Sequence, residues 1–186
     1  MNDYINGHNI ASDKNLIAII VTELMDFCEI SSIQNMQNLK DFANHFGGII
    51  VQQPIKEDIV YKYSDSTFCI SIPSHEPETE TLWQAAVRLG DAILHMHALD
   101  ISTGIDHGWH NVEQDKHYEN RDWITQNQSN LFAAFLLMPP DKFRKLCNEH
   151  TEGDVVHITE IAKHLPVSVD RVHWYAKTMH IIQPDF

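Results

Sequence analysis

The stretch from Ala85 to His95, which reads Ala-Ala-Val-Arg-Leu-Gly-Asp-Ala-Ile-Leu-His, decides the fold of this chain. It lies within a run whose apolar residues recur at helical spacing, which predicts a helix over about residues 81–99. The expected core face of this helix holds Leu82, Ala86, Leu89, Ile93 and Met96. Its polar residues form a second stripe, which consists of Gln84, Arg88, Asp91 and His95. Taken alone, this pattern is that of any amphipathic helix, so its meaning depends on the rest of the chain.

Two helices and three short strands are predicted before this long helix. The helices cover about residues 12–29, behind a Ser12 cap, and about residues 32–45, ended by Gly47-Gly48. The strands cover residues 49–51, 59–61 and 67–72, which are rich in β-branched and aromatic side chains. The sequence therefore predicts a small sheet between the first two helices and the long one.

The second half of the chain is predicted to be helical after a polar loop. The loop covers residues 104–122, and the helices cover about residues 123–138, 141–150, 158–165 and 168–179. No internal repeat, low-complexity tract or linker is visible, which indicates one domain over residues 1–186. Within it we expect an N-terminal helix in residues 1–30 and a C-terminal helical pair in residues 158–186, packed on the same core.

The composition restricts the kinds of partner. The chain of 186 residues has 26 Asp and Glu against 13 Lys and Arg, which gives a formal net charge of -13. Phosphate binding needs clustered cations, so we expect no direct nucleic-acid partner. An acidic surface is either simply solvated or able to meet a basic protein partner. The sequence does not determine the oligomeric state.

Several features indicate a cytoplasmic protein. No apolar run is long enough to span a bilayer, and the N-terminus lacks the basic start of a secretory signal. The three cysteines, Cys28, Cys69 and Cys147, form no C-x-x-C pair, which suits a reducing compartment. We therefore expect no membrane partner.

Four stretches resemble, in order, those of the ImmA/IrrE family of metallopeptidases. Residues 42–51 are similar to the family's helix-to-strand segment, and residues 86–95 align with A-H-E-L-G-H-x-x-L-H. Residues 128–139 align closely with E-A-N-x-F-A-A-x-L-L-M-P, and residues 161–168, followed by Arg171, are similar to I-A-x-x-F-x-V-S. The resemblance implies a zincin-like α+β fold, mainly helical, with a sheet of about three strands packed on the metal helix. It also implies a regulatory protein of a bacterium or phage.

The positions that carry the family's chemistry have changed. Val87, Arg88 and Asp91 stand where the family has His, Glu and His, and Gln128 stands where it has a ligating Glu. An aliphatic side chain cannot ligate zinc, and a guanidinium is a permanent cation without an acceptor. A hydrolytic zinc site needs three protein ligands and an activated water. We therefore expect a pseudopeptidase with no catalytic residue, metal or cofactor, which binds a protein partner such as a basic helix-turn-helix repressor without cleaving it.

The spacing of the changed positions predicts a contact between them. Arg88 and Asp91 are three residues apart on one helix, so we expect an ion pair across the former metal space. His95 and Gln128 would complete the hydrogen bonding. Gln84, His95 and Asn130 are candidates for lining the remaining cleft.

Three alternatives stay open. The chain could be a metal-dependent hydrolase with a non-standard site on Asp91 and His95, joined by His97 or Gln128. The loop with His107, His110 and His117 has His-x-x-His spacing and could bind a metal, although a polar loop is the simpler interpretation. Residues 158–179 have the outline of a helix-turn-helix but offer few cations, chiefly Arg171 and Lys177, so we expect a packing element.

Overall fold

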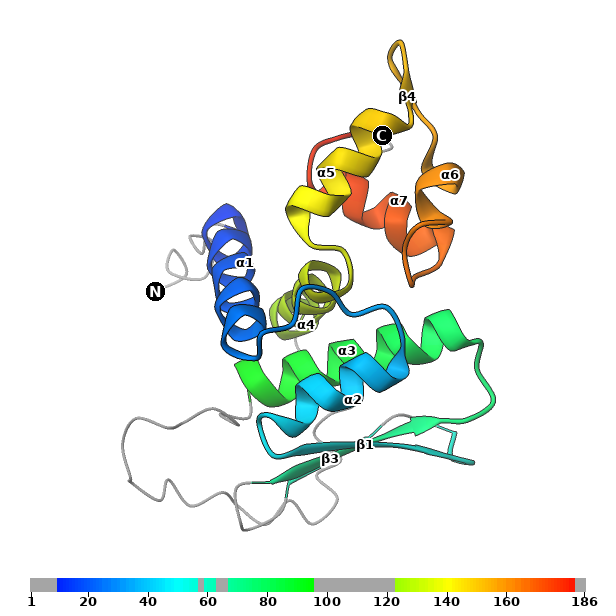
Figure 1. Ribbon diagram of the computed structural model, residues 1–186. Helices are drawn as coiled ribbons and strands as arrows, with labels where there is room; N and C mark the ends of the chain where they lie inside the picture. Colours follow the sequence, from blue (N-terminus) through cyan, green and yellow to red (C-terminus); the bar gives the residue numbers. More distant parts are fainter. Residues whose placement is uncertain (1–9, 57–58, 63–66, 96–122, 183–186) are drawn as a thin grey trace.

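The computed structural model describes residues 10–56, 59–62, 67–95 and 123–182 (Figure 1). It is mostly helical with a small sheet, which confirms the predicted α+β class. The sheet contains β1 (Gly48–Gln53), β2 (Ile59–Lys62) and β3 (Phe68–Pro73) in the order β1-β3-β2. β1 runs parallel to the central β3, and β2 runs antiparallel to it. Among the described helices, none is long and apolar enough to cross a membrane.

The β1–β3 pair is fixed by a close approach at its first position. Gly48 pairs with Phe68, whose ring lies directly over it. A β-carbon at Gly48 would come within 2.3 Å of the Phe68 ring, so only glycine fits there. Because the Phe68 side chain is itself buried, the ring has no free space to move into.

Two helices cover the sheet on one side, as Figure 1 shows: α2 (Met36–Asn44) and α3 (Glu78–Leu94). α2 begins four residues later than the helix predicted from residue 32. Asn35 caps it, since its side chain accepts a hydrogen bond from the Asn38 backbone N–H at 2.9 Å. The Asn38 side chain in turn accepts from the backbone N–H of Gln34 at 3.2 Å, so the two amides fix the start of the helix reciprocally.

α3 is buried on nearly every side, which corrects the prediction of an amphipathic helix. Its described part ends at Leu94 rather than near residue 99, and the residues from 96 onward lie outside the described range. β3 packs against it on the sheet side, and α4 (Trp123–Leu137) packs against it on the other. α4 approaches so closely that a β-carbon at Gly90 would lie 3.0 Å from the Phe132 β-carbon. The stripe that was expected to be polar therefore faces the interior in part.

The remaining elements extend the core at both ends of the chain. α1 (Ile10–Phe27) packs against α4 and ends where Glu29 takes a left-handed conformation with φ of 56°. After α4 the chain forms α5 (Pro140–Glu149), β4 (Thr151–Glu152), β5 (Val155–Val156), α6 (Ile158–Ala162) and α7 (Val169–Thr178). Figure 1 shows α5, α6 and α7 grouped at the end of the molecule away from the sheet. The β4–β5 hairpin was not predicted.

α7 contacts α3, α4 and α5 through aromatic side chains. The Tyr175 ring lies between Phe135 of α4, at a centroid distance of 5.9 Å, and Phe143 of α5, at 4.6 Å. Trp174 contacts Trp83 of α3 edge to face, with the centroids 6.1 Å apart. Burial raises the pKa of the Tyr175 hydroxyl far above its usual range.

Candidate functional site

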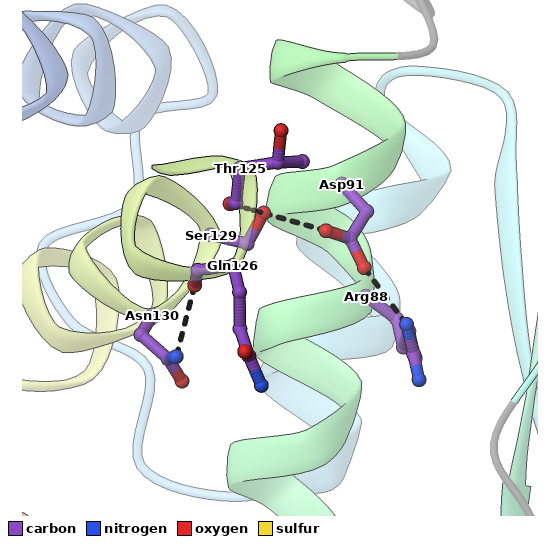
Figure 2. Close-up of polar contacts among 6 residues, drawn as sticks. All are labelled: Arg88, Asp91, Thr125, Gln126, Ser129 and Asn130. Carbon is purple, nitrogen blue, oxygen red and sulfur yellow. Dashed lines mark hydrogen bonds and ion pairs between the residues drawn. The ribbon is translucent and has the colours of Figure 1, made fainter. Parts of the chain in front are cut away.

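The predicted ion pair between Arg88 and Asp91 is present on α3 (Figure 2). The Arg88 Nη1 atom lies 3.1 Å from the Asp91 Oδ2 atom, and the two residues are one helical turn apart. The Asp91 side chain is 0% exposed and that of Arg88 is 13% exposed. The pair is therefore interior, where removal of either partner is far more costly than on a surface.

Ser129 of α4 binds the other oxygen of the Asp91 carboxylate. The Ser129 hydroxyl donates to Asp91 Oδ1 at 2.5 Å, the short distance typical of a hydroxyl bonded to an ionised carboxylate. The same hydroxyl oxygen lies 3.2 Å from the backbone carbonyl of Thr125, one turn earlier on α4 (Figure 2). Each Asp91 oxygen thus has a donor, and the contact joins α3 to α4 at the place where the two helices pack together.

Ser129 was not singled out in the sequence, because its role depends on a contact between two helices. The sequence offered only an indirect indication of this role. Ser129 is a small polar residue two positions before the apolar run from Leu131 to Met138, all of which is buried. A hydroxyl at such a position needs an acceptor inside the protein, and a carboxylate on the facing helix supplies one.

The other predicted site residues differ from this pair in their surroundings. Val87 is buried in the core. The amide nitrogen of Asn130 donates to the Gln126 backbone carbonyl at 2.9 Å, so this side chain bonds to its own helix (Figure 2). His95 follows the last residue of α3, and its backbone N–H donates to the carbonyl of Asp91 at 3.0 Å. A cleft lined by Gln84, His95 and Asn130 stays a prediction.

The side chains at the family's metal positions do not fit a zinc ion. Zinc in a hydrolytic site takes three protein ligands from His, Cys, Asp and Glu. Val87 has no donor atom, Arg88 brings a positive charge, and both oxygens of Asp91 already accept hydrogen bonds or an ion pair. Within residues 10–56, 59–62, 67–95 and 123–182, no three such side chains gather into a metal-binding group. His97 and the loop histidines His107, His110 and His117 lie outside these ranges.

Arg171 of α7 is engaged inside the protein rather than presented to a ligand. Its Nη2 atom lies 2.8 Å from Glu80 Oε1, and its guanidinium carbon lies 4.7 Å from the centre of the Trp83 ring. An ion pair combined with a cation–π contact anchors α7 to the start of α3. This arrangement favours the packing interpretation of residues 158–179 over a DNA-reading one.

The cysteines offer no nucleophile at this site. Cys28, Cys69 and Cys147 are buried free thiols. Burial raises the pKa of Cys28 and of Cys147, which keeps both in the unreactive thiol form.

Comparison with known proteins connects this geometry to a family. A family model of peptidases, described as the IrrE N-terminal-like domain, matches residues 48–173. The match begins at β1 and ends within α7, so it includes the sheet, α3 and α4 with the Arg88–Asp91–Ser129 contacts. A comparison with curated proteins found no match.

Proposed function

The chain belongs to the peptidase family of the IrrE N-terminal-like domain, and we propose that it is a member that binds a protein partner without cleaving it. It would serve as a regulatory protein in the cytoplasm of a bacterium or in a phage-infected cell. The membership supplies a metallopeptidase-like fold. The argument for inactivity comes from the residues that stand at the positions of the family's metal ligands and general base.

The complete burial of Asp91 between Arg88 and Ser129 carries the proposal. In a zinc peptidase the helix that corresponds to α3 presents two neutral imidazoles and a carboxylate toward a metal and its water. Here a guanidinium is paired with a carboxylate at 3.1 Å, and a serine hydroxyl completes the bonding of that carboxylate. The Arg88 guanidinium thus supplies positive charge next to Asp91, where the family has a metal cation.

A second argument concerns the alternative of a non-standard metal site. A cation bound by Asp91 and His95 would lie next to the Arg88 guanidinium, which repels it. It would also have to displace Arg88 or Ser129 from the carboxylate oxygens. The ion pair therefore disfavours a hydrolase built on Asp91 and makes binding the better-supported function.

The charge of the chain supports a basic partner. The net charge of -13 repels nucleic acid and attracts proteins that carry clustered Lys and Arg, such as DNA-binding regulators. Association with such a regulator would compete with its binding to DNA, because both use its basic surface.

Metal analysis and a cleavage assay test the loss of chemistry. We expect protein purified without a histidine tag to hold no stoichiometric zinc, and to cleave neither casein nor a basic repressor after zinc or manganese is added. A variant that carries Val87→His, Arg88→Glu, Asp91→His and Gln128→Glu serves as the comparison, since it restores the family's donor set. Stoichiometric metal in the unaltered protein, with cleavage that a chelator abolishes, would overturn the proposal.

A further inference from the structure

α1 exposes an apolar face that packing within the chain uses only at its end, where the Phe27 ring stacks on Phe46 with the centroids 6.3 Å apart. Leu16 is 57%, Ile19 is 59% and Phe27 is 72% exposed, although the helix already buries Ile17 and Val21 on another side. At about 100° per residue, the three exposed side chains fall within an arc of about 80° and extend over about three helical turns. A helix that packs on one side needs only one apolar stripe, so this second stripe calls for an explanation.

Acidic side chains accompany this face. Glu23 lies inside the same arc, and Asp26 and Glu29 follow at the C-terminal end of the helix, all three exposed. Among the described residues, none of the three has an ion-pair or hydrogen-bond partner for its carboxylate. Lys14 is the basic residue of α1, and its ammonium donates to the Thr178 carbonyl of α7 at 3.1 Å. The face therefore combines apolar side chains with unbalanced negative charge.

We propose that this face, which consists of Leu16, Ile19, Glu23, Asp26 and Phe27, binds an amphipathic basic helix of a protein partner. The apolar side chains of that helix would recur at helical spacing over about three turns, with Lys or Arg beside them to meet the acids. A second copy of this chain fits less well, since α1 against α1 would bring Glu23 and Asp26 toward another acidic face. The inference rests on the proposed function and adds to it the surface and the chemistry of the partner.

The test uses a defined probe and variants of exposed residues. The probe is a fluorescein-labelled amphipathic peptide of about 18 residues made of Leu and Lys, and its counterpart has Glu in place of Lys. We expect the Lys peptide to bind the full chain, with anisotropy showing affinity that falls as salt rises, and the Glu peptide not to bind. Ile19→Ser combined with Phe27→Ser should weaken binding about tenfold or more.

Two control variants make the result specific. Val155→Ser removes an apolar side chain that is 58% exposed on the β4–β5 hairpin, away from α1, and should leave the affinity unchanged. Glu23→Gln combined with Asp26→Asn should weaken binding and flatten its salt dependence. Circular dichroism verifies that each variant is folded.

Several outcomes would overturn the inference. The same affinity in the Ile19→Ser/Phe27→Ser and Val155→Ser variants would mean that general acidity attracts the peptide. Absence of binding to the unaltered chain would also reject the face as a helix-binding surface. Sedimentation that reveals a dimer lost in the Ile19→Ser/Phe27→Ser variant would assign the face to contact between copies. None of these results concerns zinc or cleavage, so they are distinguishable from failure of the proposed function.

Discussion

Removing the Arg88 guanidinium should strongly destabilise the protein. In the variant Arg88→Met the aliphatic stem remains, but Asp91, which is 0% exposed, loses the guanidinium that is paired with it. Removal of one partner of a buried pair costs about 3–5 kcal/mol, and the slight exposure of Arg88 favours the lower end. The bond from Ser129 persists and limits the loss. We therefore expect the free energy of unfolding to fall by about 3 kcal/mol, a shift of roughly 1 M or more in the urea midpoint.

A second ion pair in the same chain provides a matched control. Lys163 and Glu160 are also three residues apart and lie closer, with the Lys163 Nζ atom 2.7 Å from Glu160 Oε2. Their side chains are 62% and 49% exposed, however, so water solvates both charges. The Lys163 ammonium lowers the pKa of the Glu160 carboxyl, which indicates that the pair does interact. We expect Lys163→Met to leave the urea midpoint unchanged, because solvent takes over the solvation of Glu160.

The double variant Arg88→Met/Asp91→Leu separates the pair's net contribution from the penalty of removing only one of its partners. Replacement of a buried ion pair by apolar side chains of similar volume is often neutral, so its stability should return to within about 1 kcal/mol of the unaltered protein. Equilibrium urea unfolding followed by circular dichroism measures all of these variants. An Arg88→Met midpoint equal to that of Lys163→Met would refute the reasoning, since burial would then not govern the pair.

Three further variants test neighbouring contacts by the same unfolding measurement. Ser129→Ala removes the donor to Asp91 and should cost about 2 kcal/mol; an unchanged midpoint would mean that the bond contributes nothing net. Gly90→Ala gains about 1 kcal/mol of helix propensity but presses on Phe132, so a net loss of about 1 kcal/mol is expected, and a gain would contradict the tight packing. Tyr175→Phe removes a buried hydroxyl that has no hydrogen-bond partner among the described residues and should raise stability by up to about 1 kcal/mol, whereas a large loss would reveal a partner.

The sequence predicted those parts of the fold that depend on residues close to one another in the chain. The apolar period located α3 and α4, and the spacing of Arg88 and Asp91 predicted their ion pair, because residues three apart on a helix are neighbours whatever the rest of the fold does. Strands β1 and β3 were also located from a local pattern. Their β-branched and aromatic runs are flanked by residues that turn the chain.

Contacts between elements could not be predicted from the sequence. The helical period of α3 suggested one polar face, but burial depends on what packs against that face, and α4 covers Asp91 there. The role of Ser129 likewise depends on a contact between α4 and α3. The β4–β5 hairpin escaped prediction because its strands are two residues long, too short for an alternating pattern to appear.

The burial of Asp91 also couples the positions that would have to change for zinc ligands to return. Arg88→Glu alone would replace the guanidinium by a second carboxylate one turn from the buried Asp91, which is strongly unfavourable. Asp91→His alone would remove the carboxylate to which both the Arg88 guanidinium and the Ser129 hydroxyl donate. Each of these two single steps toward the family's donor set therefore loses stability before any metal can compensate. Because loss of either partner alone is unfavourable, a return of ligands at these two positions requires both residues to change together.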